Sequence, residues 1–257
     1  MIEKLKTLVW FALRPNHWAH ARALIIRKFE KNRDTTRLRS AATEWSAQQA
    51  VSVEQALARV GLATMGTPIP ILDPNQIRHA MKRAKKSQVK MGGSGDLRLL
   101  YAVTKLGNVN AAVETGVAYG WSSLAILSAM SEQQGARLIS IDMPYPKMNN
   151  EKFVGIVLAD EFRPHWTLIR EPDRHGISKA ISLMGRPLDL VHYDSDKSWQ
   201  GRCYGYPILW DALRSGGIFI SDDIQDNMAF REFMEQKGVE FAVTESEGKY
   251  IGITRKP

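Results

Sequence analysis

From residue 95 onward, short apolar runs alternate with segments in which apolar residues recur at helical spacing. Short apolar runs bounded by turn residues are typical of buried strands, and the wider spacing is typical of helices packed on a sheet. The predicted strands span residues 110–115, 136–141, 166–170, 188–193 and 218–221. The predicted helices span residues 122–130, 152–159, 178–183 and 204–214, the last stopped by Ser-Gly-Gly at 215–217, and a further helix ends near residue 236. We therefore expect an α/β fold with a mostly parallel sheet that is covered on both faces.

The end of the chain breaks the alternation with two consecutive strands. Residues 240–244 and 250–254 flank a short polar turn, which predicts an antiparallel pair. Asp96 can cap a further helix that reaches residue 105, just before the first strand. Ligands of open α/β sheets bind beyond the carboxyl ends of the strands, so the residues directly after each strand are the candidates for a functional site.

The part of the chain before residue 88 has helical patterns without strand patterns. Apolar residues recur at helical spacing from 43 to 62, and Ser52 with Gln55 three residues later resembles a capping box that marks a second helix start. Three prolines in residues 66–74 indicate a linker. We interpret residues 1–88 as a basic helical extension that serves as a lid, an oligomer contact or a surface contact. Residues 89–257 then form the α/β domain.

Composition identifies an ordinary globular protein. The 257 residues are 44% hydrophobic and 24% charged, which supplies enough apolar material for a core and excludes an intrinsically disordered chain. The single cysteine, Cys203, cannot form an internal disulfide. A disulfide-based scaffold is therefore excluded, and a reducing compartment, the cytoplasm, is expected.

The positive charge is concentrated near the N-terminus. Residues 1–40 contain ten Lys/Arg and three Asp/Glu, a net charge of +7 out of the +8 of the whole chain. One interpretation is a helix packed on the body of the protein with its basic face in water, as basic helices usually are. The other is a basic amphipathic helix that rests on the anionic inner membrane surface through Trp10, Phe11, Trp18 and Ile25. The apolar run at 8–13 is too short to cross a bilayer, and no nucleic-acid motif accompanies the basic residues.

A glycine turn follows the first predicted strand. Gly116 and Gly120 let the backbone turn sharply and approach a ligand, and the N-terminus of the next helix can hold an anionic group. The turn has neither the Gly-x-Gly-x-x-Gly of dinucleotide-binding proteins nor the Gly-Lys-Ser/Thr of a P-loop. Asp142 ends the second strand, about 20 residues further on, where a carboxylate can accept hydrogen bonds from two ribose hydroxyls. The two features together favour an adenosine-containing ligand.

Acidic residues follow the fourth and fifth predicted strands. Asp194 and Asp196 come after the fourth strand, and Asp222 and Asp223 come after the fifth. Carboxylates that converge on one sheet edge repel each other unless a cation lies between them. Oxygen ligands suit a hard cation such as Mg²⁺, which keeps coordination positions open for substrate. Asp194, Asp222 and Asp223 are therefore the predicted metal ligands, although aspartates in such positions also serve as helix caps and turn formers.

The glycine turn resembles that of a known enzyme family. The sequence Glu-Thr-Gly-Val-Ala-Tyr-Gly-Trp-Ser, starting at Glu114, resembles the cofactor turn of class I S-adenosylmethionine-dependent methyltransferases, and Asp142 matches their ribose-binding acid. The resemblance implies a Rossmann-like methyltransferase sheet with an antiparallel last strand. It also implies that S-adenosylmethionine binds through Glu114, Gly116, Gly120, Ser122 and Asp142.

The acidic residues resemble those of metal-dependent members of the same family. Asp194, Asp222 and Asp223 look like the metal triad of magnesium-dependent O-methyltransferases such as catechol O-methyltransferase, with Asp223 in place of an asparagine. The spacing of Asp194 and Asp196 is closer to that of the macrocin- and novobiocin-type sugar O-methyltransferases, in which the second aspartate is the proposed base. Lys197 stands where the catechol enzymes have a catalytic lysine. The resemblance implies Mg²⁺ or another divalent cation, with Asp196 or Lys197 as the catalytic base.

The resemblance covers about residues 91–257 and implies a metal-dependent O-methyltransferase that acts on a hydroxyl of a sugar or glycan-like acceptor. Two alternatives stay open: a metal-independent methyltransferase that acts on a small phenol or a protein, and a non-catalytic binding module with the same fold. The expected partners are a small-molecule or glycan acceptor and further copies of the chain as a homo-oligomer. No nucleic acid is expected as a partner.

Overall fold

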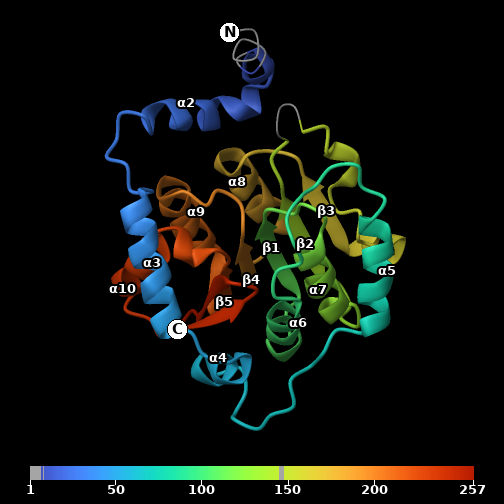
Figure 1. The fold of residues 1–257 in the computed structure, drawn as a ribbon. Helices are drawn as coiled ribbons and strands as arrows, with labels where there is room; N and C mark the ends of the chain where they lie inside the picture. The colour runs from blue at the N-terminus through green and yellow to red at the C-terminus, as the bar shows by residue number, and fades with distance from the viewer. Residues whose placement is uncertain (1–6, 8, 145–147) are drawn as a thin grey trace.

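The computed structural model describes residues 7, 9–144 and 148–257, and its centre is a seven-stranded sheet in the order β3-β2-β1-β4-β5-β7-β6 (Figure 1). The basic residues Lys4 and Lys6 and the apolar Leu8 of the N-terminal segment lie outside the described residues. The strands are β1 (Ala111–Thr115), β2 (Arg137–Ile141), β3 (Trp166–Ile169), β4 (Leu188–Tyr193), β5 (Leu213–Ser221), β6 (Phe241–Ser246) and β7 (Lys249–Arg255).

The predicted strand directions are confirmed. The pairs β1–β2, β1–β4, β2–β3 and β4–β5 are parallel, and β7 pairs antiparallel with both β5 and β6. The strand order reverses between β1 and β4, where the chain crosses from one half of the sheet to the other. That reversal marks the crevice in which open α/β sheets bind ligands. The chain therefore has the expected mostly parallel, Rossmann-like sheet.

Two hydrophobic cores form because successive side chains of a strand point to opposite faces of the sheet. Ala112 of β1 belongs to the core under one set of helices, and its neighbours Ala111 and Val113 belong to the core on the other face. The first set of helices comprises α4 (Val53–Arg59), α5 (Pro74–Ala84), α6 (Leu97–Leu106) and α7 (Trp121–Met130). The second comprises α8 (Asp173–Met184), α9 (Trp199–Ala212) and α10 (Ala229–Lys237).

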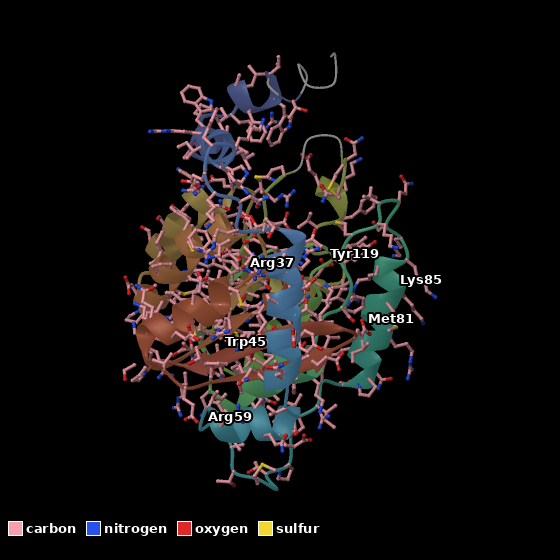
Figure 2. All side chains as sticks on the ribbon, turned by 60° about the vertical axis from the view of Figure 1, so that its left-hand side comes forward. Arg37, Trp45, Arg59, Met81, Lys85 and Tyr119 are labelled. Carbon is pink, nitrogen blue, oxygen red and sulfur yellow. The ribbon has the colours of Figure 1, made fainter. Side chains whose placement is uncertain are left out.

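The N-terminal helices differ in how they pack. Helix α3 (Thr36–Gln49) lies along the sheet edge, where Trp45 contacts Phe241 of β6 at a ring distance of 5.8 Å (Figure 2). The backbone N–H of Val51 donates to the carbonyl of Val243 at 2.8 Å, which joins the loop after α3 to the sheet. Helix α2 (Trp18–Ile26), preceded by the 3₁₀ turn Pro15–His17, has no buried residue. Figure 1 shows α2 at the end of the molecule opposite α4. The proposed division at residue 88 stays a prediction.

Two predicted elements differ from the structure, and a third is confirmed. In the helical stretch expected at 43–62, α3 ends before Ser52 and α4 begins with the predicted capping box of Ser52 and Gln55. The helix expected at 152–159 is replaced by the 3₁₀ turns Glu151–Phe153 and Asp160–His165, because Gly155 adopts φ +73° between them. The helix stop expected at 215–217 is wrong, since α9 ends at Ala212 and those residues already belong to β5. Within the described ranges, no helix is long and apolar enough to span a membrane.

Candidate active site

The glycine turn after β1 brings the backbone close to the loop after β4. Gly116 has φ +81°, and a Cβ on it would lie 2.1 Å from the carbonyl oxygen of Asp194. Gly120, with φ +91°, begins α7, and a Cβ there would lie 2.9 Å from the Cα of Gly155. Side chains larger than hydrogen therefore do not fit at either position without backbone movement. The sharp backbone turn that the sequence predicts is present and packs closely against two other loops, and its contact with a ligand stays a prediction.

Asp142 fixes this turn from the end of β2. Its Oδ2 accepts hydrogen bonds from the backbone N–H groups of Val117 at 2.9 Å and Ala118 at 3.0 Å. Its Oδ1 forms an ion pair with Arg170. Both carboxylate oxygens therefore have protein partners, and the ribose contact predicted for Asp142 requires Arg170 to release Oδ1.

Glu114 lies behind the turn. Its carboxylate is fully buried and accepts hydrogen bonds from the hydroxyls of Ser122 at 2.8 Å, Ser140 at 2.6 Å and Ser123. Glu114 and Gly120 do not line the cavity described below, whereas Ser122 does. The three hydroxyl donors replace the hydrogen bonds that the Glu114 carboxylate would otherwise make with water. We assign Glu114 to the support of the cofactor turn rather than to direct contact with a ligand.

Asp194, Asp196, Asp222 and Asp223 lie at the sheet edge after β4 and β5, which we call the acidic edge, and a lysine lies among them. Lys197 Nζ lies 3.1 Å from Asp194 Oδ1 and also forms an ion pair with Asp223. Lys249 of β7 lies 3.3 Å from the other Asp223 oxygen. Asp194 and Asp222 line the cavity, and Asp223 lies behind them. The lysine thus neutralises two of the three predicted metal ligands.

The charges at this edge shift each other's pKa values. Burial and the nearby Asp222 raise the pKa of Asp194 to about 6. Burial alone would lower the pKa of Lys197, but Asp194 and Asp223 outweigh it and raise that pKa, so Lys197 holds its proton. Burial likewise opposes ionisation of Asp223, but the contact with Lys197 lowers the pKa of Asp223.

His192 is a functional residue that the sequence analysis missed. It is fully buried in β4, with Nε2 at 3.3 Å from Asp222 Oδ1 and Nδ1 at 3.7 Å from Glu114 Oε2. Burial lowers the pKa of His192, but Asp222 and Glu114 outweigh this effect and raise the pKa to about 10. An imidazolium therefore connects the carboxylate behind the glycine turn with the acidic edge. A lone histidine inside an apolar strand gives no sequence signal of this role.

The two predicted catalytic bases differ in their surroundings. Asp196 Oδ1 accepts hydrogen bonds from the backbone N–H of Ser198 at 3.1 Å and from its hydroxyl at 2.7 Å, so Asp196 also forms the turn that starts α9. No described residue donates a hydrogen bond to its Oδ2, and Asp196 lines the cavity. Gly201 leaves room for it, because a Cβ there would lie 2.2 Å from Asp196 Cγ. Asp196 therefore has one oxygen free to accept a proton, whereas Lys197 is already protonated.

Asp173, the first residue of α8, is a second residue that the sequence analysis missed. Its carboxylate accepts hydrogen bonds from the Ser195 hydroxyl and, at 3.3 Å, from the Tyr193 hydroxyl, and it lines the cavity. Burial raises the pKa of Asp173 to about 6. The only sequence signal is its place a few residues after β3, at the same sheet edge as the other acids.

We expect Asp173→Asn to change the pH dependence of stability. The folded-state pKa of Asp173 lies above its ordinary value, so its contribution to stability is full below about pH 4 and is lost as the pH rises toward 6. Asn cannot ionise, so the stability of the variant relative to the wild type should increase over this pH window by up to about 2 kcal/mol, with cavity water screening part of the effect. Urea unfolding at pH 4, 5, 6 and 7 measures the difference. An equal difference at all four values would contradict the assignment.

One cavity of ≈ 650 Å³ lies beyond the carboxyl ends of β1, β2, β4 and β5 and is lined by residues of the glycine turn and of the acidic edge. This volume is suited to a small-molecule ligand. Gly116 and Asp142 lie at the β1–β2 side, and Asp194 and Asp222 lie at the β4–β5 side. The N-terminal segment supplies part of the wall through His20, Leu24 and Arg27. Phe11 of the same segment stacks with His20 at a ring distance of 6.3 Å.

The carboxylate oxygens of the acidic edge are ligands that suit a hard cation. Asp194 Oδ1 and Asp222 Oδ1 are buried and lack a hydrogen-bond donor. Buried carboxylate oxygens without donors are stabilised by a cation. Over the described ranges, no group of three or more His, Cys, Asp or Glu residues is arranged as a set of metal ligands. Both oxygens already lie beside a cationic side chain, since Lys197 Nζ is 3.1 Å from Asp194 Oδ1 and His192 Nε2 is 3.3 Å from Asp222 Oδ1. The carboxylates are of the type that binds a hard cation, but a metal ion would compete with these side chains, and Asp223 is engaged by lysines.

A family model of known proteins matches part of this chain. Residues 113–224 match a family model described as a methyltransferase domain. This range includes the glycine turn, Asp142, the acidic residues after β4 and both acids after β5. No curated protein sequence matches the chain significantly.

Several solved structures share the fold. An O-methyltransferase from Bacillus cereus in complex with SAH has a TM-score of 0.55 at 13% identity, over 82% of this chain and 100% of that one. The O-methyltransferase TomG from Streptomyces achromogenes, involved in tomaymycin synthesis and solved with SAM, has a TM-score of 0.54 at 13% identity, over 82% and 99%. The SAH-bound methyltransferase PaMTH1 from Podospora anserina has a TM-score of 0.54 at 14% identity, over 72% and 89%. The chain therefore has the Rossmann-like methyltransferase fold, and residues 113–224 of that fold carry the match to a methyltransferase domain.

Proposed function

We propose that the protein is an S-adenosylmethionine-dependent O-methyltransferase that uses a divalent cation to activate a hydroxyl of a sugar or glycan-like acceptor. The match over residues 113–224 and the shared fold support an S-adenosylmethionine-dependent methyltransferase. The observation that carries the proposal is that the glycine turn after β1 and the carboxylates after β4 and β5 line the same cavity. A methyl donor and an activated acceptor can meet there.

The β1–β2 side of the cavity suits the methyl donor. Gly116 lines the cavity beside the loop after β4, so its backbone can contact a ligand there, and the N-terminus of α7 can receive a carboxylate. Asp142 holds the turn in shape, and its Oδ1 can accept a ribose hydroxyl when Arg170 releases it. When bound there, S-adenosylmethionine would supply a methyl group on its sulfonium.

The β4–β5 side suits the acceptor. Asp194, Asp222 and Asp223 would hold Mg²⁺ or another divalent cation, which would lower the pKa of a bound hydroxyl. Asp196 is the base that fits best, because its free oxygen faces the cavity and can take the proton of the acceptor hydroxyl. Lys197 would then act by neutralising Asp194 and Asp223. His20 and Arg27, from the N-terminal segment, would form the opposite wall of the acceptor site.

A metal-independent methyltransferase is the second candidate. One specific observation favours it: the Lys197 ammonium already bridges Asp194 and Asp223, so their negative charge is balanced without a metal ion. In that case Lys197 would stabilise the acceptor oxygen directly. The two candidates share the methyl donor and differ in their response to chelation.

Titration calorimetry tests both candidates. We expect S-adenosylmethionine to bind the full chain with one site, and Mg²⁺ to bind with an affinity that falls at least tenfold in Asp222→Asn. Glu132→Gln in the turn after α7, an exposed carboxylate that pairs with Lys105, serves as the control and should bind Mg²⁺ unchanged. Absence of S-adenosylmethionine binding would refute both candidates. Cofactor binding without any Mg²⁺ binding would favour the metal-independent one.

A further inference from the structure

The N-terminal segment exposes an unusual concentration of apolar surface. Seven of the twelve large apolar side chains that are exposed in the described part of the chain lie between residues 9 and 29. The most exposed are Phe29 at 85%, Leu13 at 74%, and Trp18 and Ile25 at 57% each. Apolar residues that gather on one surface mark an interaction site rather than ordinary scattered exposure.

Helix α2 presents two different faces. His20, Leu24 and Arg27 follow the i, i+4, i+7 spacing and line the cavity. Trp18, Arg22 and Ile25 follow the same spacing about half a turn away, and Phe29 continues this row in the turn after the helix. We call Trp18, Arg22, Ile25 and Phe29 the outer face of α2. The inner face is explained by the cavity, and the outer face has no partner within the described chain.

Basic side chains predominate around the outer face, although the exposed Glu30 directly follows Phe29. From Val9 to Phe29 the sequence contains no acid, and the exposed Arg22 and Lys28 have no ion-pair partner among the described residues. Arg27, by contrast, is held by Asp34 at 2.8 Å on the inner side. Basic and apolar side chains combined on one exposed helix face suit an interface between water and anionic lipid.

We propose that the outer face of α2 docks on the surface of an anionic lipid bilayer. Trp18, Ile25 and Phe29 would enter the headgroup region, and Arg22 and Lys28 would contact lipid phosphates. The indole N–H of Trp18 already donates to the carbonyl of Ala12 at 3.2 Å, so its ring can leave water without losing a hydrogen bond. Because the inner face of the same helix lines the cavity, docking brings the acceptor side of the cavity to the lipid surface.

A second copy of the chain is a poorer fit to this face. In a two-fold interface the same patch meets itself, so the basic Arg22 and Lys28 of both copies would be brought together with Glu30 as the one acid next to the patch in each copy. Anionic lipid supplies the missing negative charge. The docking surface is independent of the proposed chemistry, since lipid binding needs no turnover.

Vesicle co-sedimentation of the full chain tests the proposal. We expect at least tenfold stronger binding to vesicles of phosphatidylcholine with 30% phosphatidylglycerol than to pure phosphatidylcholine. We also expect 0.5 M NaCl to weaken the binding, because at this ionic strength the Debye length is only about 4–5 Å and the attraction between Arg/Lys and lipid phosphates is screened. Two variants separate the contributions. Ile25→Ser with Phe29→Ser removes apolar contact, and Arg22→Glu with Lys28→Glu reverses charge. Each should reduce binding at least tenfold while leaving the melting temperature unchanged.

A matched control uses helix α5, which Figure 2 shows on a different part of the surface from α2. Its Met81 is 53% exposed, and Lys85 is exposed close to it. Met81→Ser with Lys85→Glu therefore changes one apolar and one basic residue and should bind vesicles like the wild type. Equal binding to neutral and anionic vesicles, or an equal loss in the α5 control, would overturn the proposal. So would a dimer in analytical ultracentrifugation that the α2 variants convert to a monomer.

Discussion

Replacing His192 with glutamine should lower the free energy of unfolding at pH 7 by about 3–5 kcal/mol, the cost of removing one partner from a buried charge pair. His192 is fully buried between Glu114 and Asp222 and is the cation that both carboxylates approach. Glutamine keeps a polar side chain of similar length but carries no charge. The two carboxylates would then be left without their shared counter-ion.

The loss should depend on pH in a defined direction. The pKa of His192 is raised to about 10 in the folded protein, above its ordinary value of 6.5. The stability that its charge contributes is therefore complete below about pH 6.5 and is lost as the pH rises through 10. The difference between wild type and His192→Gln should accordingly shrink between pH 7 and pH 10. Urea unfolding followed by circular dichroism at these pH values measures it.

A compensating variant distinguishes charge from packing. Adding Glu114→Gln to His192→Gln removes one of the uncompensated carboxylates and should recover part of the lost stability. The hydroxyls of Ser123 and Ser140, which share one carboxylate oxygen, can still donate to the amide oxygen of the substituted side chain, and the Ser122 hydroxyl can accept from its NH2 group. If the double variant were less stable than His192→Gln alone, the destabilisation would come from packing and not from charge.

The strand pattern and the helix caps could be predicted from the sequence because they depend on local chemistry. A capping aspartate needs only its own neighbours, so the prediction that Asp96 starts a helix is confirmed by its bond to Leu99 N at 2.9 Å. The capping box at Ser52 and Gln55 is confirmed for the same reason. Parallel strands require their carboxyl ends to meet, which brings Asp194 and Asp222 onto one cavity wall as expected.

Other features depend on contacts between distant segments and could not be predicted in this way. The helix expected at 152–159 has suitable spacing, but Gly155 takes a left-handed conformation under the ring of Trp166, where a Cβ would lie 2.4 Å from the indole. The same limit applies to Lys197. Its sequence position permits a catalytic base, but the three-dimensional arrangement surrounds it with Asp194 and Asp223 and raises its pKa.

His20 shows how the N-terminal segment enters the site. Nothing in its local sequence connects it with the acidic edge, yet α2 brings it onto the cavity wall, where the charge of Asp196 acts on its pKa. Burial lowers the pKa of His20, and this effect outweighs the opposite influence of Asp196. The His20 imidazole is therefore neutral near pH 7. It gives the cavity wall a polar group without adding a charge there.

Replacing Asp196 with asparagine should reduce methyl transfer by about a hundredfold to ten-thousandfold, the usual contribution of a general base. Asn keeps the oxygen that accepts hydrogen bonds from Ser198 but cannot take a proton from the acceptor. The turn that begins α9 should therefore stay intact. The binding of S-adenosylmethionine should also be unchanged, because Asp196 lies on the β4–β5 side of the cavity. A tritiated methyl-transfer assay with a panel of sugar and phenol acceptors provides the rate, and calorimetry provides the affinity.

If Asp196 is the base, Lys197→Met should differ from Asp196→Asn in its response to Mg²⁺. Removal of the ammonium takes away the cation beside Asp194 and leaves Asp223 with Lys249 alone, so the pKa values of both carboxyls should rise, that of Asp194 more, and the protein should lose stability as the pH increases. Methyl transfer should then recover in part when Mg²⁺ is raised, because a metal ion can replace the missing positive charge. Asp196→Asn should show no such recovery. Recovery of Asp196→Asn by added Mg²⁺, together with a Lys197→Met variant that Mg²⁺ cannot rescue, would instead identify Lys197 as the base.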